Sequence, residues 1–149
     1  MYNQVIPEIA YHLCRNEIKS TISLSLGKKT SYIANNIGKS KVSVMNLDKV
    51  NIDGEKTDYI IEKGEDKLIF VELKDSDIIK AIGQIDNTIE SLIANSRKSS
   101  IIILARIIPT KVYSPDLRDN RFKRFELKLK SYHPENSIRV KSNILEETI

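Results

Sequence analysis

Three charged side chains near the middle of the chain have the types and spacing that metal-assisted hydrolysis of a phosphodiester requires. Thirteen residues separate Asp58 from Glu72, and Lys74 follows Glu72 by two positions. Such hydrolysis needs hard oxygen ligands for a divalent ion, a positive group near the reacting phosphate, and an activated water. Two carboxylates and one ammonium supply the first two requirements if the fold brings them together.

A β-hairpin is predicted to position these residues. Residues 57–62 and 67–74 have the composition of strands, and the four residues between them form a turn that contains a glycine. Side chains alternate along a strand, so Glu72 and Lys74 share one face. In a tight hairpin Asp58 pairs beside Glu72, and one ion can bridge the two carboxylates. The simpler interpretation is a surface ion pair between Glu72 and Lys74, which contributes little to stability.

The other expected elements place this hairpin in an α/β domain with a mixed sheet. A strand, a helix and a second strand in succession predict parallel pairing of the two strands. The expected elements are a helix over 7–20, a half-buried strand over 22–26, extended structure from 42 to 47, a helix capped by Asp77 and running to Asn95, a buried strand over 99–108, a basic helix over 117–132 with Phe122, Phe125 and Leu129 as apolar anchors, and an edge strand over 138–141.

Length and composition predict one globular domain over residues 1–149, with 40% hydrophobic and 30% charged residues. The longest apolar run, 101–105, is too short to cross a bilayer, and no signal peptide is expected at the N-terminus. A single cysteine, Cys14, excludes an internal disulfide and a cysteine-based zinc site. These features favour a cytoplasmic protein without membrane contact.

Basic charge is concentrated in the C-terminal third. The net charge is +4, and residues 106–141 hold ten Lys and Arg against four acids. This distribution is compatible with a polyanionic partner, and equally with a solvated helix face.

The pattern of Asp58, thirteen residues, Glu72-Leu73-Lys74 and then a helix containing Gly83-Gln84 resembles the PD-(D/E)xK nuclease superfamily. Its members include restriction endonucleases and archaeal Holliday-junction resolvases. The resemblance covers about residues 50–108 and departs from the family at Thr57, where proline is usual. It implies a restriction-endonuclease-like αβββαβ core, in which helices flank a mixed sheet.

The resemblance also implies roles for individual residues. Asp58 and Glu72 would bind Mg²⁺ or Mn²⁺, with the Leu73 carbonyl as a further ligand. Lys74 would orient or deprotonate the attacking water and stabilise the developing charge on phosphate. Gln84 would steady the site or contact nucleic acid. The helical pattern alone is equally compatible with a solvated Gln84.

Many family members place a glutamate of the first helix near the metal, and two residues compete for this role. On a helix over 7–20, Glu17 falls inside the apolar face, whereas Glu8 projects to the opposite side. A buried carboxylate needs a partner, so Glu17 is the preferred candidate. A salt bridge to another residue would explain Glu17 equally well.

We therefore expect a Mg²⁺-dependent endonuclease that hydrolyses nucleic acid, with DNA as the expected substrate. Homodimerisation and a partner subunit in a defence, repair or mobile-element system are further expectations. The alternative is a non-catalytic module that keeps the nuclease fold and binds nucleic acid or protein. Phosphate contacts are expected from the basic helix, at Arg118, Arg121, Lys123, Arg124 and Lys128.

Other patterns in the chain are weaker. Gly38-Lys39-Ser40 resembles the end of a phosphate-binding loop but lacks its leading glycine, because position 33 is Ile33. The two histidines, His12 and His133, do not have the spacing of a zinc site.

Overall fold

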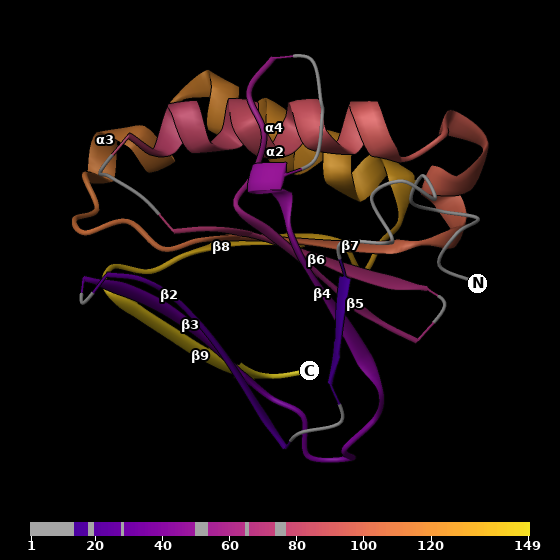
Figure 1. Ribbon diagram of the computed structural model, residues 1–149. Coiled ribbons are helices and arrows are strands. Elements are labelled where there is room, and N and C mark those ends of the chain that lie inside the picture. The colour runs from indigo at the N-terminus through magenta and orange to yellow at the C-terminus, as the bar shows by residue number, and fades with distance from the viewer. Residues whose placement is uncertain (1–13, 18–19, 28, 50–53, 65, 74–76) are drawn as a thin grey trace.

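The chain folds into three layers, with helices on one side of a central sheet and a second, smaller sheet on the other (Figure 1). The computed structural model describes residues 14–17, 20–27, 29–49, 54–64, 66–73 and 77–149. The elements in chain order are β1 (Cys14–Glu17), β2 (Thr21–Leu26), β3 (Thr30–Asn35), β4 (Val42–Asn46), the 3-10 turn η2 (Leu47–Lys49), β5 (Tyr59–Lys63), β6 (Lys67–Glu72), α2 (Ile78–Leu92), the 3-10 helix η3 (Asn95–Ser100), β7 (Ile102–Ile107), α3 (Ser114–Leu117), α4 (Asn120–Tyr132), β8 (Ser137–Val140) and β9 (Ile144–Thr148).

The central sheet is mixed, as the sequence predicts. Its strand order is β1-β4-β5-β6-β7-β8. The first four strands pair antiparallel, whereas β6, β7 and β8 are parallel neighbours. Parallel neighbours require a crossover connection, and α2 and α4 lie in the two crossovers.

The helices cover one face of the central sheet and enclose the larger core. The apolar stripe of α2 packs there with Leu68 and Phe70 of β6. From α4, Phe125 and Leu129 are buried and Phe122 packs at the margin, so all three predicted anchors contact this core. Within the described residues, no helix has both the length and the hydropathy needed to cross a membrane.

A three-stranded sheet with the order β2-β3-β9 covers the opposite face. β2 confirms the strand expected over 22–26, and Ile22 and Leu24 are buried between exposed neighbours. The alternation does not extend to Leu26, which is 49% exposed. The sequence analysis missed β3 and β9. Their buried residues include Tyr32, Ala34 and Leu145, which join Ile69 and Val71 of β6 in a second core between the sheets.

Two predicted helices differ in the structure. The helix expected over 7–20 is wrong at Cys14–Glu17, which form strand β1 and pair antiparallel with β4; residues 1–13 and 18–19 lie outside the described part. Pairing with β4 supplies the backbone hydrogen bonds that a helix would otherwise make internally. The basic helix expected over 117–132 is two helices, because Asp119 caps α4 by accepting a hydrogen bond from the Arg121 amide at 2.8 Å.

A buried polar cluster joins the second sheet to the central one. Glu147 of β9 accepts hydrogen bonds from the Tyr32 hydroxyl at 2.7 Å, from Arg106 Nε at 2.7 Å and from Arg139 Nη1 at 3.0 Å. The guanidinium of Arg106, a residue only 4% exposed, also donates to the Ser137 hydroxyl. Burial by itself would raise the pKa of Glu147, but the bonds from Arg106 and Tyr32 lower it below its usual value. Burial, followed by the charge of Glu147, raises the pKa of Tyr32.

Replacing Glu147 with alanine should lower the free energy of unfolding by about 3 to 5 kcal/mol, because the Arg106 guanidinium would stay buried without its carboxylate. The matched control is Glu146→Ala, in the same strand, where an exposed carboxylate accepts a bond from Asn35. We expect the control to lose less than about 1 kcal/mol. Urea denaturation measures both, and equal losses would contradict a special role for the cluster.

A second buried carboxylate makes stability depend on pH. Glu62 of β5 is 4% exposed, and burial raises its pKa to about 8. Between the unfolded pKa near 4.5 and about 8 the native state binds more protons than the unfolded state, so stability falls as the pH rises through this window.

Glu62→Gln should remove this dependence. As the pH rises from 4 to 9, the free energy of unfolding of the native chain should fall by at least about 1 kcal/mol more than that of the variant. Denaturation curves at both pH values test this, with the exposed Glu126→Gln as the control. Parallel pH profiles for the native chain and Glu62→Gln would refute the assignment.

Candidate active site

The β5–β6 hairpin brings Asp58 and Glu72 to the same end of the central sheet. Tyr59 pairs with Val71, so one residue further along each strand Asp58 lies opposite Glu72. The Leu73 amide donates a hydrogen bond of 2.8 Å to Asp58 Oδ2. This is the juxtaposition that the sequence predicts for a tight hairpin.

Glu72 lies on the helix-covered side of the sheet. Side chains alternate along β6: Ile69 and Val71 face the second sheet, whereas Leu68 and Phe70 face the helices. Glu72 lies two residues after Phe70 and therefore shares its face. Its side chain is 0% exposed. This burial contradicts the interpretation of Glu72 as half of a surface ion pair, and a carboxylate in such a place requires compensating charge or hydrogen bonds.

Helix α2 holds the segment that leads into Asp58. The Thr57 amide donates to Thr88 Oγ1 at 2.9 Å, and the Thr57 hydroxyl donates to the Val71 carbonyl at 3.0 Å. One turn earlier in α2, Gln84 Nε2 donates to the Lys56 carbonyl at 3.4 Å. Gln84 is 6% exposed, so the interpretation as a solvated glutamine is wrong. Its observed contact fixes the backbone two residues before Asp58.

A close approach of the chain to α2 reinforces this arrangement. The Asn87 side-chain amide donates to the Glu55 carbonyl. Gly54 beside it has a φ of +82°, and a Cβ at this position would lie 3.3 Å from Asn87 Nδ2. Glycine suits both the backbone conformation and the available space.

Sequence reasoning missed Thr57, Thr88 and Asn87 as supporting residues. The available signal was the helical spacing of Gln84 and Thr88, four residues apart and both polar beside an apolar stripe. That spacing predicts a shared surface, but it does not reveal which strand segment lies against it.

The site lies where parallel strands β6 and β7 end, which is the left end of the molecule in Figure 1. The Ile108 amide donates to the Glu72 carbonyl at 2.9 Å, so β7 continues its pairing to the level of the site. Helix α2 begins there as well. Its predicted cap is confirmed, because Asp77 Oδ1 accepts a hydrogen bond from the Lys80 amide at 2.9 Å.

Of the five basic residues expected to contact phosphate, two form ion pairs with acidic side chains of the same chain. Lys128 Nζ forms ion pairs with Asp86 at 2.8 Å and Glu90 at 3.1 Å. Burial by itself would lower the pKa of Lys128, but the hydrogen bonds to Asp86 and Glu90 raise it above its usual value. Arg121 pairs with Asp119 at 2.9 Å.

The remaining three, Arg118, Lys123 and Arg124, are exposed at the start of α4 or just before it. The start of α4 lies near the start of α2. The hydrogen bond to Asp119 is the main cause of the raised pKa of Arg121, and the charge of Asp77 at the cap of α2 adds to it. These exposed cations therefore lie on the helix side of the same end of the sheet as the carboxylates.

The side chains of two predicted site residues, Lys74 and Glu17, and of the competing candidate Glu8 cannot be placed. Lys74 and Glu8 lie outside the described residues. The Glu17 backbone pairs with Val42 in β1, so the argument that chose Glu17 from a helical face no longer holds. The roles of Lys74 and Glu17 stay predictions.

The described residues bring two carboxylates together at this site. Among them, no group of three or more His, Cys, Asp and Glu side chains is placed to hold a metal ion. The third ligand predicted at the site, the Leu73 carbonyl, is a backbone group and is therefore not counted among these side chains.

Comparisons with protein-family models, with curated proteins and with solved structures give no match to this chain.

Thr88→Val should reduce the free energy of unfolding by about 1 to 3 kcal/mol, because it leaves the buried Thr57 amide without its acceptor. The same substitution at Thr21, which is exposed in β2, is the control and should change stability by less than about 0.5 kcal/mol. Chemical denaturation provides both values. An unchanged midpoint for Thr88→Val would mean that α2 does not hold this segment.

Proposed function

We propose that this chain is a metal-dependent nuclease that hydrolyses nucleic acid phosphodiesters, and specifically a Mg²⁺-dependent DNA endonuclease with a PD-(D/E)xK core. The observation that carries the proposal is the position of Asp58 opposite Glu72, one residue beyond the Tyr59–Val71 pair, with Asp58 accepting a hydrogen bond from the Leu73 amide. Both positions match the resemblance residue by residue.

The order of elements around the hairpin supports the same proposal. Antiparallel β4, β5 and β6 are followed by α2 and by β7, which is parallel to β6. This order is the one expected for the βββαβ portion of the restriction-endonuclease-like core that the resemblance implies, and it supports the proposal. The first helix of that core would fall largely in residues that the structure does not describe.

The donor set fits a hard divalent cation. Asp58, Glu72 and the Leu73 carbonyl would hold Mg²⁺ or Mn²⁺, since these ions favour carboxylate and carbonyl oxygens. A bound ion would polarise the phosphoryl oxygen and make a bound water more acidic. The hydrogen bond from the Leu73 amide orients the Asp58 carboxylate beside Glu72. Gln84 and Thr88 position the backbone before Asp58, and Lys74 would orient the attacking water and stabilise charge on the phosphate.

Nucleic acid would reach this site along the exposed cations at the start of α4. Arg118, Lys123 and Arg124 are the principal contacts in this proposal, because Lys128 and Arg121 already pair with acids. Contacts of this type bind phosphate without reading sequence, and they weaken as the salt concentration rises.

The test is cleavage of labelled duplex DNA, single-stranded DNA, branched DNA and RNA in Mg²⁺ or Mn²⁺. Glu72→Gln, Asp58→Asn and Lys74→Ala should each slow cleavage at least about a hundredfold while binding persists. Glu55→Gln is the control, because this exposed acid lies three residues before Asp58 and should retain the native rate.

Titration calorimetry with Mn²⁺ gives a readout that is independent of cleavage. The native chain should bind the ion, and Asp58→Asn and Glu72→Gln should weaken that binding, whereas Glu55→Gln should not. A native chain that binds nucleic acid, but neither binds the metal nor cleaves any of the substrates, would establish the non-catalytic binding module instead.

A further inference from the structure

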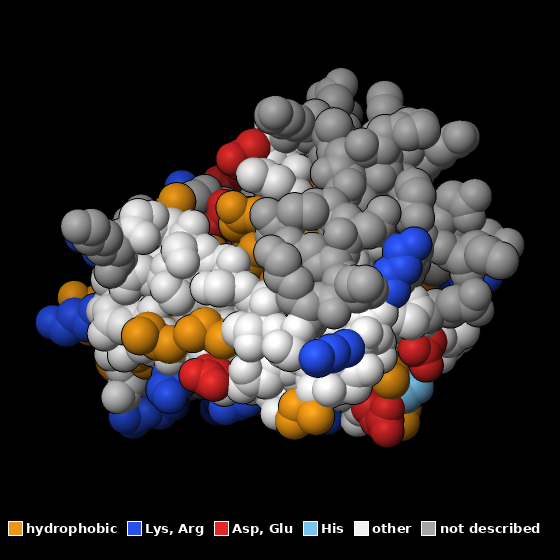
Figure 2. All heavy atoms as spheres, turned by 60° about the horizontal axis from the view of Figure 1, so that its bottom comes forward, with side chains coloured by type: hydrophobic (Ala, Val, Ile, Leu, Met, Phe, Trp, Pro, Cys, Tyr) orange, Lys and Arg blue, Asp and Glu red, His pale blue; other side chains and the backbone are white. Residues whose placement is uncertain are grey.

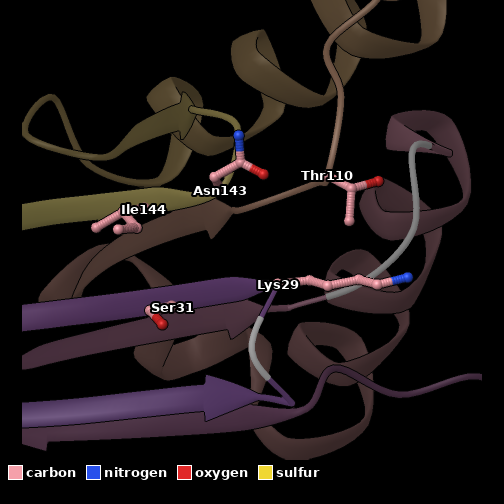
Figure 3. Close-up of a pocket in the computed structure, with 5 residues that line it drawn as sticks. All are labelled: Lys29, Ser31, Thr110, Asn143 and Ile144. Atoms are coloured by element: carbon pink, nitrogen blue, oxygen red, sulfur yellow. The ribbon is translucent and has the colours of Figure 1, made fainter.

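A polar depression lies on the side of the central sheet that faces away from the helices. It has a volume of about 500 Å³ and is lined by Lys29, Ser31, Thr110, Asn143 and Ile144 (Figure 3). It lies at the starts of the paired strands β3 and β9, beside the loop that follows β7. Ser31 and Ile144 belong to the outward-facing side chains of these strands, because the next residues, Tyr32 and Leu145, face the core. We call these five residues the inter-sheet groove.

Backbone hydrogen bonds connect the inter-sheet groove to the candidate active site. The Ile108 amide donates to the Glu72 carbonyl at 2.9 Å, and the carbonyl of the next residue, Pro109, accepts from the Asn143 amide at 2.9 Å. The Asn143 carbonyl in turn accepts from the Ser31 amide at 2.8 Å. Adjacent strands are about 4.8 Å apart, so the groove lies within a few strand spacings of Glu72.

One of the five lining residues, Lys29, is a cation, three are uncharged polar residues, one is apolar, and none is acidic. Lys29 is exposed, and an exposed Lys141 lies two residues before Asn143 in the chain. Lys111 follows Thr110 directly, but its ammonium lies over the Tyr113 ring, 5.0 Å from the ring centre. Figure 2 shows Lys and Arg side chains along the left and lower-left margin of the face that carries the second sheet, with Asp or Glu side chains close by and further Lys or Arg to the right. The β2–β3 and β8–β9 turns and α3 lie at the left end in Figure 1.

Lysine, serine, threonine and asparagine side chains are the groups that commonly contact phosphate and sugar in nucleic acid complexes. The cations at the start of α4 lie on the helix side of the central sheet, and the inter-sheet groove lies on the opposite side. The candidate active site lies at the edge formed by the ends of the central strands β5 and β6, with its carboxylates on the helix side. A nucleic acid crossing that edge would therefore meet positive charge on both sides of the carboxylates.

We propose that the inter-sheet groove binds the phosphate backbone of the nucleic acid, on the flank of the candidate active site opposite to α4. This inference rests on the proposed function, and it names a contact surface that the basic helix does not provide.

The test compares two double variants that change the net charge equally. Lys29→Glu with Lys141→Glu replaces the cation that lines the groove and one that borders it. Lys41→Glu with Lys130→Glu alters exposed lysines elsewhere: Lys41 follows the far end of β3, and Lys130 lies in the last turn of α4. Fluorescence anisotropy with a short labelled DNA duplex in metal-free buffer gives the affinity over a range of KCl concentrations. Thermal denaturation checks that both variants are folded.

The groove variant should bind at least about tenfold more weakly than the native chain. Its plot of log affinity against log salt concentration should be shallower by about one to two units, one for each phosphate that the groove no longer neutralises. The control variant should bind within about twofold of the native chain. Equal weakening in both variants, or no weakening in either, would overturn the proposal.

Cleavage separates this inference from the proposed function. At saturating duplex with Mg²⁺, the groove variant should cleave at close to the native rate, because the carboxylates are intact, and only its KM should rise. Native cleavage together with unchanged KM and binding in the groove variant would refute the groove alone. Groove-dependent binding by a native chain that does not cleave would refute catalysis alone. A native chain that binds neither duplex DNA, single-stranded DNA nor RNA would refute both.

Discussion

The rest of the structure depends on β6 being covered on both faces. Leu68 and Phe70 contribute to the core beneath the helices, and Ile69 and Val71 contribute to the core between the sheets. A slip of one residue would exchange the two sets and carry the buried Glu72 to the opposite layer. Dense packing on both sides therefore specifies the register with β5, and that register places Asp58 opposite Glu72. The position of the candidate site is a consequence of core packing.

The two layers that cover the central sheet use different interactions. Helix α2 presents an apolar stripe to the sheet, and the polar residues Gln84 and Thr88 at its margin hold the backbone that leads into Asp58. The second sheet adds apolar contacts and one charged cluster, in which Glu147 meets Arg106 and Tyr32. Hydrogen bonds to a buried charge are strongly directional, so this cluster gives the second sheet a defined position as well as stability. Because the residues of the inter-sheet groove from β3 and β9 belong to the second sheet, their position is fixed in the same way.

The packing of the layers determines which Lys and Arg side chains pair with acids and which remain exposed. Lys128 and Arg121 belong to the basic helix in sequence, yet in the fold their charges face acids of α2 and of the α4 cap. Lys29 and Lys141 are more than a hundred residues apart in sequence, yet they border the same end of the second sheet, because β3 and β9 pair in parallel there. The net charge of a segment is therefore a poor guide to where a polyanion would bind, and the fold decides which cations remain available.

Much of the core was predictable from the sequence because its signals are local. The hairpin turn, the alternation along β6, the stripe and cap of α2, and the parallel β6–β7 pair all follow from the spacing of neighbouring residues. β1 and β9 were not predictable, because their partners, β4 and β3, lie far away in the chain. β3 forms a hairpin with the neighbouring β2, but its own residues are mostly small or polar and give a weak strand signal. Ser31 pairs with Ile144 and Ala34 with Glu147, and the partly buried carboxylate of Glu147 is compensated by hydrogen bonds from Arg106 and Tyr32. The sequence by itself determined which residue types stand at the end of the hairpin. Only the tertiary structure decided that Glu72 is buried, that Gln84 and Thr88 hold the approach to Asp58, and that a second sheet closes the far side, since each of these depends on contacts between distant segments.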